Sequence, residues 1–106
     1  MQQDIHVRVG DTFEIPLEGS AGTGFRWEYN PSSAAARLVK LLDERVEAAS
    51  TVPGGRTVKF FHFQAVSPGH LELTFRYRRA WEDPKSGTVK TVAVQIDPPA
   101  RPGEGS

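Results

Sequence analysis

Apolar and polar residues alternate along most of the chain. Ile5, Val7 and Val9 lie two positions apart in the first alternating segment, so they share one face of an extended backbone. Five further segments follow the same pattern: 13–17, 25–29, 61–65, 71–77 and 92–96. Alternation of this kind between breaks of Gly, Pro and Ser is typical of short, half-buried β-strands.

The residues at the breaks indicate how the strands connect. Gly10-Asp11 predicts a turn after the first strand. Ser67-Pro68-Gly69 predicts a turn that joins 61–65 to 71–77 as a hairpin. Pro16 cannot donate a hydrogen bond to a neighbouring strand, so its strand is expected at a sheet edge or at a bulge.

Residues 32–49 fit two structures. Ser32 at a capping position and a run of alanines favour a helix, as do apolar residues at helical spacing: Leu38, Leu41, Leu42 and Val46. The alternation of Val39 with Leu41 favours a strand, and so does the need of the flanking strands for a partner. The residues alone lean slightly toward a helix, and strand or helix stays open for residues 34–48.

About seven short strands favour an all-β fold, an immunoglobulin-like Greek-key β-sandwich, over an α/β arrangement. The 106 residues suffice for one domain of this kind. We expect residues 1–97 to form the sandwich. The Pro- and Gly-rich residues 98–106 have no apolar pattern to bury and are expected to form a flexible tail.

Composition restricts the classes of partner. The 13 basic and 13 acidic residues give a formal net charge of zero, so no overall field favours nucleic acid or anionic lipid. Four arginines could form a basic strip, but in a neutral chain we interpret them as a solvated sheet face: Arg26, Arg76, Arg78 and Arg79. No apolar run approaches the length of a membrane span. We expect neither nucleic acid nor a membrane as a partner.

Candidate catalytic groups are few. The chain has no cysteine, which excludes thiolate nucleophiles, disulfides and cysteine metal sites. The histidines are scattered and lack the spacing of metal ligands: His6, His62 and His70. Glu82-Asp83 is interpreted as a solvated turn. The Gly-rich residues 19–24 lie between two strands, whereas a phosphate site needs a following helix. We expect no catalytic residue, no metal and no cofactor.

Three loops contain residues that a turn does not require. They are Gly22-Thr23-Gly24, Val52-Pro53-Gly54-Gly55 and Arg79-Ala80-Trp81-Glu82. In a sandwich, the loops at one end converge although they are distant in sequence. Trp and Arg are residue types that anchor protein interfaces. The alternative for Trp81 is that its indole folds back as a lid on the core.

These three loops, in this order, resemble those of the chagasin-like family of cysteine-peptidase inhibitors (inhibitor family I42), and the resemblance covers about residues 5–96. The family's first loop reads Asn-Pro-Thr-Thr-Gly-Tyr/Phe-x-Trp. The chain matches it at Thr23, Gly24, Phe25 and Trp27 and departs from it at Ser20, Ala21 and Gly22. The second loop, Gly-x-Gly-Gly, and the third, Arg-Pro-Trp, are matched at Gly54, Gly55, Arg79 and Trp81.

The resemblance implies an immunoglobulin-like sandwich that reversibly inhibits papain-like cysteine peptidases by laying the three loops across the active-site cleft. The peptidase-binding residues it implies are Gly22, Thr23, Gly24, Phe25, Gly54, Gly55, Arg79 and Trp81. Thr23 would hydrogen-bond near the catalytic Cys and His of the peptidase, between glycines that allow close approach of the backbone. Arg79 and Trp81 would anchor the other flank. The free protein is expected to be a monomer.

The family pattern also makes residues 37–46 extended. Ala21 and Ala80 replace two prolines of the family's loops, which removes two constraints on loop shape. We therefore expect weaker binding or a different target rather than a different fold. The alternative function is an immunoglobulin-like module that binds a protein or a carbohydrate without inhibiting a peptidase, because a fold alone does not fix a function.

Overall fold

The computed structural model describes residues 3–20, 22–48, 55–83 and 85–99. Within these residues the chain forms seven strands and one helix. In chain order they are β1 (Gln3–Arg8), β2 (Thr12–Ser20), β3 (Phe25–Tyr29), α1 (Ser33–Leu38), β4 (Val39–Ala48), β5 (Arg56–Ala65), β6 (Gly69–Arg79) and β7 (Thr88–Asp97). Among the described residues, no helix has the length and apolar character that a membrane crossing requires.

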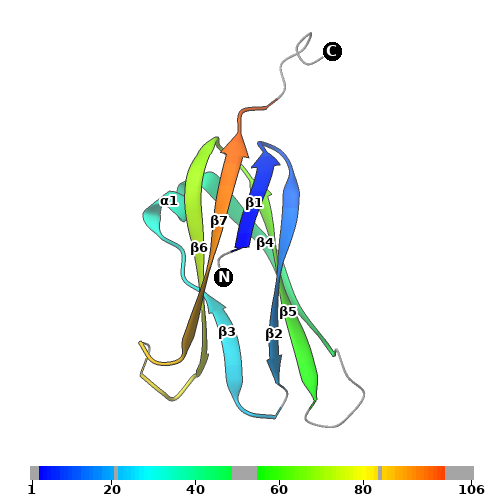
Figure 1. The fold of residues 1–106 in the computed structure, drawn as a ribbon, viewed down its shortest axis with the longest axis vertical. Helices are drawn as coiled ribbons and strands as arrows, with labels where there is room; N and C mark the ends of the chain where they lie inside the picture. Colours follow the sequence, from blue (N-terminus) through cyan, green and yellow to red (C-terminus); the bar gives the residue numbers. More distant parts are fainter. Residues whose placement is uncertain (1–2, 21, 49–54, 84, 100–106) are drawn as a thin grey trace.

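The strands form two sheets that face each other (Figure 1). One sheet has four strands in the order β1-β7-β6-β3, and the other has three in the order β2-β5-β4. β1 pairs with β7 in parallel, and all the other pairs are antiparallel. The predicted all-β, immunoglobulin-like sandwich is confirmed. β2 lies at a sheet edge, as Pro16 predicts.

The predicted hairpin of residues 61–65 with 71–77 is wrong. β5 pairs with β2 and β4, whereas β6 pairs with β3 and β7, so the chain crosses between the sheets at residues 66–68. Both strands bury one face against the same core. Their alternation is therefore the same whether they lie side by side in one sheet or face to face across the sandwich.

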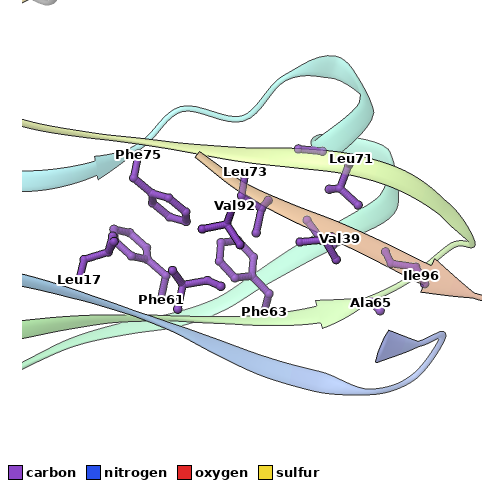
Figure 2. Packing of buried hydrophobic residues seen from close by; sticks show 13 residues of the cluster. Leu17, Val39, Phe61, Phe63, Ala65, Leu71, Leu73, Phe75, Val92 and Ile96 are labelled. Carbon is purple, nitrogen blue, oxygen red and sulfur yellow. The ribbon is translucent and has the colours of Figure 1, made fainter. Parts of the chain in front are cut away.

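The core lies between the two sheets (Figure 2). Its buried side chains are Ile15, Leu17, Ala35, Val39, Phe61, Phe63, Ala65, Leu71, Leu73, Phe75, Val92, Val94 and Ile96. Phe63 of β5 is completely buried. Its ring centroid lies 5.5 Å from that of Phe13 and 5.0 Å from that of Tyr29, so it joins aromatic side chains from both sheets.

Residues 33–48 combine the two structures that the sequence left open. The hydroxyl of Ser32 accepts a hydrogen bond from the Ala35 amide (3.1 Å) and caps α1, and Ala35 is buried. The helix ends at Leu38 because Val39 pairs with Ala65 and starts the ladder between β4 and β5. The predicted extended segment 37–46 is therefore wrong for Arg37 and Leu38 and correct from Val39 onward.

A bulge in β4 explains why its apolar residues fit both the spacing of a helix and the alternation of a strand. The register with β5 shifts between Leu41 and Asp43, so Leu42 is the extra residue, and it is exposed. A single inserted residue shifts the alternation by one position. β7 ends at Asp97, directly before the predicted tail of residues 98–106. Residues 100–106 lie outside the described residues, so the flexible tail stays a prediction.

Replacement of Phe63 by alanine tests the packing of the core. Phe63→Ala removes a completely buried ring, and we expect the free energy of unfolding to fall by about 3–5 kcal/mol. Val66→Ala is the control, because Val66 is 48% exposed and its truncation is expected to change the free energy by less than about 0.5 kcal/mol. Urea unfolding followed by circular dichroism measures both. Equal losses of unfolding free energy in the two variants would contradict the packing of Phe63 in the core.

Candidate functional site

Three connections leave the strands at the same end of the sandwich, at the bottom of Figure 1. Within each sheet, pairing places strand ends next to each other here: Ser20 lies opposite Arg56, Ala48 opposite Thr57, and Phe25 opposite Arg79. The segments Gly22–Phe25 and Arg79–Glu82, which we call the loop edge, both lie here. Gly55, next to Arg56, also lies at this end, whereas Gly54 lies outside the described residues.

The first segment of the loop edge is closed by its own threonine. The Thr23 hydroxyl donates a hydrogen bond to the Ser20 carbonyl (3.2 Å) and accepts one from the Phe25 amide (3.3 Å). Gly22 and Gly24 have φ angles of +78° and +81°, which residues with a side chain rarely adopt. In the free protein the Thr23 hydroxyl is thus engaged within its own turn.

Arg79 ties the two segments of the loop edge together. Its Nε donates a hydrogen bond to the Thr23 carbonyl (3.0 Å). Its guanidinium carbon lies 4.4 Å from the centroid of the Phe25 ring, within the range of a cation–π interaction. Two segments more than fifty positions apart in the sequence are therefore held in a fixed relative position by one side chain.

Trp81 is the most exposed large apolar side chain of the described residues, at 74%. The alternative in which its indole covers the core is therefore wrong. The indole approaches Gly24, where a Cβ atom would lie only 2.6 Å from Cη2 of Trp81. Glycine at position 24 thus permits both the positive φ and the close approach of the indole.

An aromatic stack supports the loop edge from the interior. Tyr77 stacks on Phe25 and Trp27, with ring centroids 5.1 and 4.8 Å apart. Its hydroxyl accepts a hydrogen bond from the Ser20 amide (2.9 Å), and Nε1 of Trp27 donates to the Glu18 carbonyl (3.0 Å). The alternation along 71–77 placed Tyr77 on the inner face, but no local pattern indicates a partner 57 positions away.

Glu82 and Asp83 shape the third connection. The Glu82 amide donates to the Arg79 carbonyl (3.1 Å), and the Glu82 carboxylate accepts from the Arg79 amide (3.3 Å). The Asp83 carboxylate accepts a hydrogen bond from the Lys85 amide (2.8 Å). Both acids therefore stabilise a turn, as predicted, although Glu82 is half-buried rather than solvated.

The four arginines of the predicted solvated face behave differently from one another. Arg26 is exposed. Arg76 donates to the carbonyls of Lys85 and Ser86 at 2.8 and 3.0 Å. Arg78 and Arg79 likewise donate to loop carbonyls. The prediction is therefore wrong for three of them: Arg76, Arg78 and Arg79 hold the backbone of the loops.

Two histidines each contact a single carboxylate: His6 contacts Asp97 on the neighbouring strand, and His62 contacts Asp43 (3.1 Å). His70 lies at the start of β6, whose other end is at the loop edge. Nowhere in residues 3–20, 22–48, 55–83 and 85–99 do three or more His, Asp or Glu side chains form a group that could hold a metal ion.

Fold and loop edge together define the class of protein: an immunoglobulin-like sandwich with an exposed, internally braced set of loops at one end. A family model described as chagasin family peptidase inhibitor I42 matches residues 6–96. The chain belongs to the chagasin family of peptidase inhibitors, which confirms the resemblance drawn from the three loops. It is therefore an inhibitor and not an enzyme. No curated protein matches the chain.

Solved structures of similar fold cover nearly the whole chain. The cysteine protease inhibitor EhICP2 from Entamoeba histolytica has a TM-score of 0.73 and 21% identity, covering 90% of this chain and 86% of its own. The solution structure of amebosin has a TM-score of 0.63 and 21% identity, covering 89% of this chain and 88% of its own. The structure of PbICP-C in complex with falcipain-2 has a TM-score of 0.54 and 21% identity, covering 92% of this chain and 89% of its own.

Addition of a methyl group at position 24 tests the contact between the loops. Gly24→Ala places a Cβ against the Trp81 indole, so we expect the indole N–H resonance of Trp81 to shift in the NMR spectrum. Gly10→Ala is the matched control, because Gly10 also has a positive φ (+98°) but nothing within 4 Å of an added Cβ. Both variants should lose about 1–2 kcal/mol of stability from backbone strain. An unshifted Trp81 resonance in Gly24→Ala would contradict the contact.

Proposed function

We propose that this chain inhibits papain-like cysteine peptidases reversibly, by inserting the loop edge into the active-site cleft. The observation that carries the proposal is the exposed Trp81 indole, held against the turn of Gly22, Thr23 and Gly24 at one end of a chagasin-family sandwich. The complex of PbICP-C with falcipain-2 supports this class of target.

The loop edge is ordered before any partner binds. Arg79 bonds the Thr23 carbonyl and covers the Phe25 ring, and Thr23 closes its own turn. Loops that are already fixed lose little conformational entropy on association, so more of the contact energy remains as affinity. This bracing supports binding of the free conformation without rearrangement.

Trp81 is the residue expected to contribute most to affinity. A large exposed indole gains free energy when a partner removes it from water, and Trp is enriched among interface hot spots. The turn at Gly22–Gly24 is expected to reach deepest, because two of its three residues carry no side chain. Inhibition is expected to be reversible, and a disulfide with the peptidase is excluded because the chain has no cysteine.

Truncation of Trp81 separates binding from folding. We expect Trp81→Ala to raise the inhibition constant for papain by at least about tenfold. Its melting temperature is expected to change by less than about 3 °C, because the side chain is mostly exposed. Val66→Ala, an exposed apolar residue outside the loop edge, is expected to inhibit like the wild type.

A titration of papain with the unmodified chain is the primary test. Stoichiometric or submicromolar inhibition is expected. No inhibition of papain or a cathepsin at micromolar concentrations would contradict the proposal, and a large loss of stability in Trp81→Ala would contradict its assignment as a contact residue.

The two hydrogen bonds of Thr23 generate a second prediction. Thr23→Ala removes a donor and an acceptor from the turn, so we expect inhibition to weaken by about five- to tenfold. Thr23→Ser keeps the hydroxyl and is expected to stay within about twofold of the wild type. Equal inhibition by all three proteins would show that the hydroxyl contributes neither to the turn nor to binding.

A further inference from the structure

Arg78 donates hydrogen bonds to backbone carbonyls of the turn that contains Trp81. Its Nη1 donates to the carbonyls of Arg79 (3.1 Å), Ala80 (3.4 Å) and Glu82 (3.2 Å). The side chain is only 14% exposed. The three carbonyl oxygens flank Trp81 on both sides in the sequence, so one cation fixes the backbone on both sides of the indole.

The opposite side of the same guanidinium is held by Glu28 of β3. Nη2 of Arg78 lies 3.1 Å from Oε1 of Glu28, and Nε donates to Oε2 at 3.3 Å. In the register, Glu28 lies opposite Arg76 and Arg26 lies opposite Arg78, so this ion pair is a diagonal contact between β3 and β6. The two-point contact orients the planar guanidinium, which leaves Nη1 directed at the turn.

Ala80 places few limits on the shape of this turn. Alanine has no ring to fix the backbone φ angle, as a proline would. The charge of Arg78 strengthens its hydrogen bonds to the carbonyls of Arg79, Ala80 and Glu82. These bonds from one side chain therefore restrict the shape of a turn that Ala80 leaves free.

We infer that Arg78 is a positioning residue for inhibition. It holds the turn of Arg79, Ala80 and Trp81 in the conformation that seats the indole over Gly24, and Glu28 orients it. The inference rests on the proposed function for its effect on affinity, but the conformational effect can be measured without a peptidase.

A double-mutant cycle tests whether Arg78 acts through Trp81. Arg78→Met keeps the aliphatic stem and removes the charge-assisted hydrogen bonds, so we expect the inhibition constant for papain to rise by about tenfold or more. In a Trp81→Ala background the same substitution is expected to cost less than about threefold. Equal fold-changes in the two backgrounds, or no change in either, would overturn the inference.

Two matched variants separate geometry from charge. Arg26→Met removes the same charge from an exposed position opposite Arg78 in the register and is expected to inhibit like the wild type. Arg78→Lys keeps the charge but lacks the planar fork, so it is expected to inhibit no better than Arg78→Met within about twofold. Wild-type inhibition by Arg78→Lys would overturn the inference.

Amide hydrogen exchange gives a readout that does not depend on inhibition. In Arg78→Met, exchange at residues 80–83 is expected to accelerate by at least about tenfold, while the buried core position Leu73 keeps its wild-type rate. Unchanged exchange at residues 80–83 would overturn the inference. If Arg78→Met does not fold, Glu28→Gln carries the same comparison, with about threefold faster exchange expected. A wild-type chain that fails to inhibit, yet shows these exchange changes, would count against the proposed function alone.

Discussion

The contacts of Tyr77 connect the core of the sandwich to its loops. The phenol ring stacks between Phe25 and Trp27 of β3, and its hydroxyl bonds the last residue of β2. Gly19 leaves space for the ring, because a Cβ there would lie 3.0 Å from the phenol oxygen. One side chain of β6 thus contacts both the last residue of β2 and the first residue of β3, the two strands that the turn containing Thr23 connects.

The sequence predicted the strands well because burial imposes a period of two on each strand separately. It predicted pairing less well, because pairing depends on distant residues. The hairpin of 61–65 with 71–77 failed for that reason, since facing and neighbouring strands have the same pattern. The start of α1 followed from a local signal, the Ser32 cap, whereas its end depends on the pairing of Val39 with Ala65.

The candidate site shows the same division between local and distant information. The residue types at Thr23, Gly24, Arg79 and Trp81 were sufficient to indicate the family. The role of Arg78 in holding the turn of Trp81 was not found, because Arg78 binds backbone carbonyls, and a carbonyl has no residue type that a sequence pattern could show. The same holds for Arg76, which binds the carbonyls of Lys85 and Ser86. An alternating strand marks these arginines only as outward-facing, and the ladder with β3 decides that Glu28 lies beside Arg78.

The turn at Gly22–Gly24 joins β2 of the three-stranded sheet to β3 of the four-stranded sheet. It is therefore a covalent bridge across the seam of the sandwich. A peptidase that binds this turn together with Trp81, which belongs to the connection after β6, would contact both sheets at once. Because such a partner binds only the folded arrangement of the two sheets, the complex would oppose their separation and protect the whole domain against unfolding and proteolysis.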